Sequence, residues 1–238
     1  LMGAPPGYVG YEAGGQLTNA VKENPFCILL FDEIEKAHAT ILDKFLQILE
    51  DGRMTDGQGN TVYFSETIII FTSNLGIYVK DDFGHRVANV TMDMPYSEVQ
   101  TRVRGAIEDY FKLELGRPEI LNRIGENIVV FDYIRREAAE LILKGQVNKI
   151  ISRLREQKSI RIRIEDFAYN SLQEAAIADL SNGGRGIGNQ VESLLINPLS
   201  RWLFDHEISG NADIVIEGFD TAANPPSVIC RREEEENK

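Results

Sequence analysis

The most constraining feature of the sequence is an apolar run that ends in two adjacent acids. Residues 27–31 read Cys-Ile-Leu-Leu-Phe, and Asp32 and Glu33 follow at once. A continuous apolar run is typical of a strand that is buried on both faces of a parallel sheet. Such a strand would deliver both carboxylates to its carboxyl end, where α/β sheets hold their ligands. The run therefore predicts an α/β fold with a site at that edge.

Neighbouring segments extend the α/β pattern. Residues 67–71 (Thr-Ile-Ile-Ile-Phe) predict a second buried strand that ends at Thr72-Ser73-Asn74, and residues 127–131 predict a weaker third strand. Apolar residues at helical spacing in residues 41–49 predict a helix between the first two strands. Strands that are separated by helices favour a parallel-sheet core.

The pattern changes after about residue 132, where helices come to dominate. We expect helices over residues 138–154, 167–180 and 187–206, and short strands over residues 160–164, 212–217 and 227–231. The sequence thus predicts three parts: a large subdomain at residues 1–133, a smaller, mainly helical subdomain at residues 134–232, and an acidic tail at residues 233–238.

Composition narrows the function classes. The net charge of −12 argues against a nucleic-acid backbone as the main partner, because such binding needs a basic patch. The longest apolar stretches are too short to span a bilayer, and the start lacks a signal-peptide pattern, so no membrane partner is expected.

Cys27 and Cys230 have no metal or redox spacing, which favours the cytoplasm. His38, His85 and His206 do not cluster, which argues against a histidine metal site.

Residues 28–33 match the Walker B pattern, in which four apolar residues precede Asp-Glu. The first acid, Asp32, can hold Mg²⁺ directly or through water, and Mg²⁺ neutralises phosphate charge. The second acid, Glu33, can polarise a water for attack on a γ-phosphate. This motif alone leaves open a buried strand that merely ends in acids.

Several further motifs accompany this strand in a fixed order. They are GAPPGYVGYE at residues 3–12, EKAH at 35–38, LEDGRMTDGQG at 49–59, TSN at 72–74, RPEILNRI at 117–124 and GGRG at 183–186. In this order the set resembles the Clp family of AAA+ unfoldases, specifically the second ATPase ring of ClpB- and ClpC-like proteins. The resemblance extends from residue 1 to about residue 205.

The resemblance implies ATP and Mg²⁺ as cofactors and assigns a role to each matching residue. Asp32 looks like the Walker B metal acid, Glu33 like the catalytic glutamate, and Asn74 like sensor 1, which orients the attacking water. Arg123 looks like the arginine finger that reaches a neighbouring subunit's site. Arg185 looks like sensor 2, which touches the same phosphates and couples nucleotide state to the angle between subdomains.

Each assignment has a simpler alternative. Asn74 could merely cap a strand or turn, and Arg123 could form a surface ion pair worth less than about 1 kcal/mol. Arg185 lies between glycines and could simply be a solvated loop residue.

The resemblance also assigns a substrate contact. Tyr8 and Val9 lie between glycines, and an exposed aromatic on a mobile loop can grip an extended polypeptide without reading its sequence. In the family this loop lines the axial pore, whereas the alternative is a tyrosine packed under a loop. Residues 51–59 are a candidate for a second hairpin that faces the pore.

The main departure from the family is the phosphate-binding loop. No G-x-x-x-x-G-K-[ST] occurs in the 238 residues, and the family places that loop upstream of Gly3. We therefore expect an incomplete AAA+ core without the phosphate-loop strand and helix, in a fragment of a longer protein. Because that loop cradles the phosphates, the fragment alone should neither bind ATP tightly nor hydrolyse it.

Smaller departures bear on subfamily and partners. No (Ile/Leu/Val)-Gly-(Phe/Leu) tripeptide lies between Asn74 and Arg117, so a ClpP-type peptidase partner is not expected. The residues after Arg123-Ile124 and after Arg185 also differ from the usual pattern, which leaves the subfamily open.

The leading hypothesis is an ATP-dependent unfoldase or disaggregase module that threads unfolded or aggregated polypeptide through the pore of a self-assembled ring, a hexamer in the parent protein. One alternative is a non-hydrolysing scaffold or regulatory subunit without a phosphate-binding loop. Another is an AAA+ protein that acts on nucleic acid, against which the net charge and the Gly-Tyr-Val-Gly loop both argue.

Overall fold

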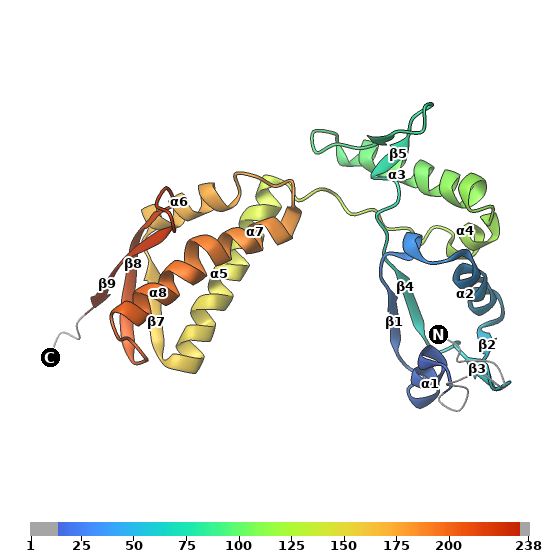
Figure 1. Cartoon of the computed structure of the whole chain (residues 1–238), viewed down its shortest axis with the longest axis horizontal. Coiled ribbons are helices and arrows are strands. Elements are labelled where there is room, and N and C mark those ends of the chain that lie inside the picture. The colour runs from blue at the N-terminus through green and yellow to red at the C-terminus, as the bar shows by residue number, and fades with distance from the viewer. Residues whose placement is uncertain (1–13, 234–238) are drawn as a thin grey trace. The chain divides into compact units, whose positions relative to one another are not determined.

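The computed structural model describes residues 14–233, except for the side chain of Ala39. The chain divides between Asp132 and Tyr133 into two compact units (Figure 1). In residues 14–233 no helix combines the length and the apolar character that a membrane crossing requires.

The first unit contains a two-stranded parallel sheet, two small hairpins and the helices that pack around them. Its elements in chain order are α1 (Gln16–Glu23), β1 (Ile28–Phe31), η1 (Ile34–Lys36), α2 (Ala39–Asp51), β2 (Arg53–Thr55), β3 (Thr61–Tyr63), β4 (Ile68–Phe71), β5 (Tyr78–Lys80), β6 (Arg86–Ala88), α3 (Tyr96–Asp109), η2 (Tyr110–Glu114) and α4 (Pro118–Ile124).

The parallel sheet is formed by β1 and β4, which pair in register with Leu29 opposite Ile69 and Phe31 opposite Phe71. On the inward face, Phe31 and Phe71 pack against Phe45 of α2, with ring centroids 4.4 Å and 5.2 Å from that of Phe45. Aromatic pairs in such edge-to-face contact stabilise a core beyond the area that they bury. This contact fixes the sheet against α2 (Figure 1).

The opposite face of the sheet is bare. Ile28, Leu30 and Ile68 are each at least 60% exposed, and Ile70 is 43% exposed. The sequence-based expectation of a strand buried on both faces is therefore wrong for the described residues, because nothing among them packs against this side. The continuous apolar composition of β1 and β4 belongs to a sheet that is covered twice, whereas a half-solvated sheet would alternate.

Residues 127–131 do not form the third strand that the sequence predicts. They belong to none of the sheets found in residues 14–233, and Val129 and Phe131 are 75% and 87% exposed. Instead, the backbone carbonyl of Val130 accepts a hydrogen bond from the Tyr96 hydroxyl at 2.9 Å, and that of Ile128 accepts one from Arg104. A strand needs a ladder partner, and side chains replace that partner here.

The second unit packs helices against a three-stranded sheet. Its elements are α5 (Arg136–Lys158), β7 (Ile160–Ile164), α6 (Asp166–Ala176), α7 (Gly183–Val191), η3 (Glu192–Ile196), α8 (Asn197–Asp205), β8 (Ala212–Asp220) and β9 (Ser227–Glu233). Strand β8 lies centrally, parallel to β7 and antiparallel to β9. The core side chains Leu143, Leu172, Ile187, Leu195 and Ile216 are fully buried.

The long helix expected at residues 187–206 begins earlier and is interrupted. It starts at Gly183 and passes through the π-helical turn η3 before α8. Pro198 follows this turn and has no N–H to donate, so the regular hydrogen-bond ladder cannot run through it unchanged. The expected fold class, an α/β core with a smaller, mainly helical subdomain, is confirmed.

Candidate functional site

Polar residues gather at the carboxyl ends of β1 and β4, an edge that we call the rim. Because the two strands are parallel and in register, Asp32 and Thr72 leave the sheet side by side. The Thr72 hydroxyl donates a hydrogen bond to the Asp32 carboxylate and accepts one from the Glu33 backbone N–H at 3.1 Å. The Thr72 carbonyl also accepts the Ile34 N–H at 3.0 Å. Thr72 thus holds both acids at the end of β4.

A second set of contacts attaches the loop after β4 to the loop after β1. The Glu35 carboxylate accepts hydrogen bonds from the Ser73 hydroxyl at 2.8 Å and from the Asn74 backbone N–H at 3.2 Å. The Leu75 N–H donates to the Ser73 hydroxyl at 3.0 Å. The structure therefore places Asp32, Glu33 and Asn74 at one edge of one sheet.

Glu33 has an unusual backbone conformation. Its φ of 54° lies in the left-handed region, which a non-glycine residue adopts at a cost of about 1 kcal/mol or more. Its carboxylate pairs with Lys36 at 2.6 Å, and this hydrogen bond raises the pKa of Lys36. Strained residues of this kind cluster at functional sites.

Two arginines of the first unit differ in how firmly they are held. Arg117 donates to Asp43 at 2.8 Å, and this hydrogen bond lowers the pKa of Asp43. Arg123 on α4 meets Glu50 of α2 at only 3.5 Å, and its side chain is 51% exposed. Within residues 14–233, neither arginine forms a hydrogen bond or ion pair with a residue of the rim. An exposed pair of this geometry contributes little to stability, so Arg123 can exchange partners at little cost.

The remaining predicted site residues lie elsewhere. Arg185 is in the first turn of α7 in the second unit, where it is exposed, and its role stays a prediction. Tyr8 and Val9 fall outside the described residues.

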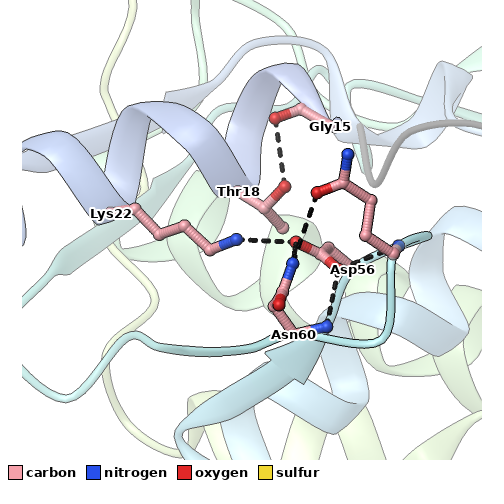
Figure 2. A network of polar contacts seen from close by, with 6 residues as sticks. Gly15, Thr18, Lys22, Asp56 and Asn60 are labelled. Carbon is pink, nitrogen blue, oxygen red and sulfur yellow. Dashed lines mark hydrogen bonds and ion pairs between the residues drawn. The ribbon is translucent and has the colours of Figure 1, made fainter. Parts of the chain in front are cut away.

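The candidate second hairpin, predicted at residues 51–59, is formed by β2 and β3 and extends to residue 63, and a buried acid holds its turn. Asp56 is 5% exposed and accepts backbone hydrogen bonds from Gln58 at 2.9 Å and Asn60 at 2.8 Å. Lys22 of α1 donates to the same carboxylate at 2.7 Å. Figure 2 shows this contact. Chiefly through Lys22, the pKa of Asp56 lies well below its usual range. The network fastens α1 to the hairpin.

Comparison with known proteins matches both units. The family model described as AAA domain (Cdc48 subfamily) matches residues 1–127. The chain belongs to the AAA domain family. The model described as the C-terminal, D2-small domain of ClpB protein matches residues 134–216. Together the two matches identify the chain as a ClpB-like second-ring segment.

Named relatives agree with these matches. Chaperone protein ClpB 2 of Synechocystis sp. is 40% identical over 222 residues, which cover 92% of this chain and 24% of that protein. Chaperone protein ClpB of Meiothermus ruber is 39% identical, with 91% and 24% covered. Chaperone protein ClpB2, chloroplastic, of Oryza sativa subsp. japonica is 39% identical, with 95% and 22% covered. The chain spans about a quarter of the length of these relatives.

Three residues at the rim, Thr72, Glu35 and Lys36, were not predicted as site residues from the sequence. Nor was Lys22 predicted as a partner of Asp56. The Asp-Gly-Gln-Gly segment does signal a turn that an aspartate closes. Nothing local signals Lys22, which is 34 residues away from Asp56.

Removing the buried carboxylate should selectively weaken the first unit of this AAA domain. We expect Asp56→Ala to lower the free energy of unfolding of that unit by about 3 kcal/mol, because the variant breaks a partly buried ion pair. Since the folded-state pKa is depressed, the contribution of Asp56 is present above its unfolded pKa of about 3.9 and is lost as the pH falls below that value.

The free energy of unfolding is measured by denaturant unfolding of the chain. Hydrogen exchange of peptides from residues 14–132 reports separately on the first unit. Trp202, the single tryptophan, lies in the second unit and provides an internal reference. Lys112→Ala is the matched control, since it breaks the exposed Lys112–Glu108 pair and should change the free energy of unfolding little. Equal effects of Asp56→Ala and Lys112→Ala would show that the network contributes no special stability.

Proposed function

We propose that the rim is part of the ATP-hydrolysis site of a ClpB-like protein-remodelling ATPase. The proposal is supported by the two hydrogen bonds of Thr72, to the Asp32 carboxylate and from the Glu33 N–H, which hold both acids at one sheet edge. The AAA domain match and the relatives, which are named chaperone proteins, support it.

The acids at the rim suit a nucleotide-bound magnesium ion. Carboxylate oxygens are ligands that Mg²⁺ prefers. The exposed Asp32 carboxylate uses one oxygen for Thr72, and its other oxygen accepts no hydrogen bond within residues 14–233. Asp32 would hold the ion directly or through water, and bound Mg²⁺ would neutralise phosphate charge.

The other site residues would act on water and on phosphate charge. Glu33 would accept a proton from the attacking water, and the Asn74 side-chain amide would orient that water. Arg123 would supply a fixed cation to the site of the neighbouring subunit, and its loose contact with Glu50 suits a group that must change partners. Arg185 would bring a second cation from the small subdomain.

We propose that the phosphate cradle and the cover of the bare sheet face belong to a longer protein. The relatives are about four times the length of this chain, and the exposed apolar face formed by Ile28, Leu30, Ile68 and Ile70 is typical of a sheet that packs on both sides. In that protein, assembly into a hexameric ring would bring Arg123 to the nucleotide site of the neighbouring subunit.

The loop with Tyr8 and Val9 would pull unfolded or aggregated polypeptide through the pore. A cytoplasmic location and the lack of a ClpP-type partner remain expectations.

A non-hydrolysing scaffold or regulatory subunit is the second candidate. The observation that favours it is that no G-x-x-x-x-G-K-[ST] occurs in the 238 residues. If the full-length protein hydrolyses ATP and loses this activity when Glu33 is changed, the ATPase is supported. If the full-length protein does not hydrolyse ATP, the scaffold is supported.

In the full-length protein, Glu33→Gln should lower kcat for ATP about 100-fold or more while nucleotide is still bound, because the base is lost and the metal acid stays. Glu66→Gln removes an exposed carboxylate from the same unit and should change neither quantity. Tyr8→Ala should leave hydrolysis largely intact and stop unfolding of a model substrate. Full hydrolysis by Glu33→Gln would contradict the proposed ATPase site.

The 238-residue chain by itself should not bind ATP tightly, because the backbone N–H cradle and the lysine of a phosphate-binding loop are absent from its sequence. Isothermal calorimetry with MgATP measures this directly. Low-micromolar affinity would show that these residues hold the phosphates without such a loop.

A further inference from the structure

We propose that Glu35 is a positioning residue that holds the loop carrying Asn74 at the rim. Its contribution to hydrolysis rests on the function proposed above. Its structural role rests on hydrogen bonds that exist without a nucleotide.

The two oxygens of Glu35 serve consecutive residues of the opposite loop. One accepts from the Ser73 hydroxyl at 2.8 Å, and the other accepts from the Asn74 backbone N–H at 3.2 Å. The Ser73 hydroxyl in turn accepts the Leu75 N–H at 3.0 Å. One carboxylate therefore fixes three successive residues, two of them directly. Hydrogen bonds to an ionised carboxylate are about twice as strong as neutral ones.

Glu35 is itself well placed to act as an anchor. It lies in the short helix η1 (Ile34–Lys36), whose first N–H, that of Ile34, donates to the Thr72 carbonyl at 3.0 Å. The helix closes on itself through the Ala37 N–H, which donates to the Ile34 carbonyl at 3.0 Å. The helix that carries Glu35 is thus itself attached to the end of β4, next to Ser73 and Asn74.

Two side chains, Thr72 and Glu35, hold different parts of the rim. Thr72 holds Asp32 and Glu33, and Glu35 holds Ser73 and the backbone of Asn74. The side-chain amide of Asn74 makes no hydrogen bond among the described residues, and the residue is exposed. Glu35 therefore fixes the backbone of Asn74 and leaves the amide group free for a ligand.

The same contacts argue against a direct chemical role for Glu35. Both of its oxygens accept hydrogen bonds from donors of the opposite loop, which directs the carboxylate at that loop. A positioning role and a direct role make opposite predictions for the Glu35→Gln variant. Its side-chain amide oxygen can still accept from the Asn74 N–H, and its NH₂ group can donate to the Ser73 hydroxyl, so both attachments survive without the charge.

The test uses Glu35→Ala, Glu35→Gln and Ser73→Ala in the full-length protein. Because misplacement of a catalytic group by about 1 Å can cost 100-fold in rate, we expect Glu35→Ala to lower kcat roughly 10- to 100-fold with little change in the KM for ATP. Glu35→Gln should restore most of the activity. Ser73→Ala removes one attachment and should fall between them. Glu66→Ala, which removes an exposed carboxylate outside the rim, is the matched control.

A second readout does not depend on hydrolysis. Hydrogen exchange of a peptide that contains residues 73–75 should become faster in Glu35→Ala, stay close to wild type in Glu35→Gln and not respond to Glu66→Ala. If wild type does not hydrolyse ATP, the proposed function fails, and this exchange alone decides whether Glu35 holds the loop.

Three results would overturn the proposal. If Glu35→Gln loses as much activity as Glu35→Ala, the charge acts directly and the attachment does not matter. Unchanged exchange in Glu35→Ala would show that Glu35 does not hold the loop. Faster exchange with unchanged kcat in an active enzyme would show that the loop does not need holding.

Discussion

The structure of the site depends on one pairing, the in-register parallel contact of β1 with β4. The register sets Phe31 opposite Phe71, so the next residue of each strand leaves the sheet at the same level. The Thr72 hydroxyl can then reach both Asp32 and Glu33. A slip of one residue would turn every side chain of the shifted strand to the other face and separate these groups. Everything at the rim follows from this register.

The sequence predicted the parts of the fold that local patterns encode. The apolar runs gave both parallel strands, and Asp32, Glu33 and Asn74 follow directly from where those strands end. It failed where a partner decides the outcome. Residues 127–131 have strand composition but no ladder partner among the described residues, and β1 has the composition of a doubly covered strand with one face bare. The apolar composition of β1 and β4 predicts burial on both faces, whereas the residues described in the structure cover only one face.

The same reasoning explains which site residues were missed. Glu35 meets Ser73 from 38 residues away, and Lys22 meets Asp56 from 34 residues away. Such contacts arise from the packing of whole elements and leave no periodic trace in the chain. The assignments of Arg123 and Arg185 came from motif order alone, since an exposed arginine has no local signature of function.

In the proposed function, the rim formed by the ends of β1 and β4 faces a bound nucleotide. The most direct measurement is an experimental structure of the full-length protein with a non-hydrolysable ATP analogue and Mg²⁺. We expect the ion to lie within one water of the Asp32 carboxylate, with the Asn74 amide directed toward the terminal phosphate. A nucleotide bound away from this sheet edge, with Asp32 and Asn74 facing solvent, would contradict it.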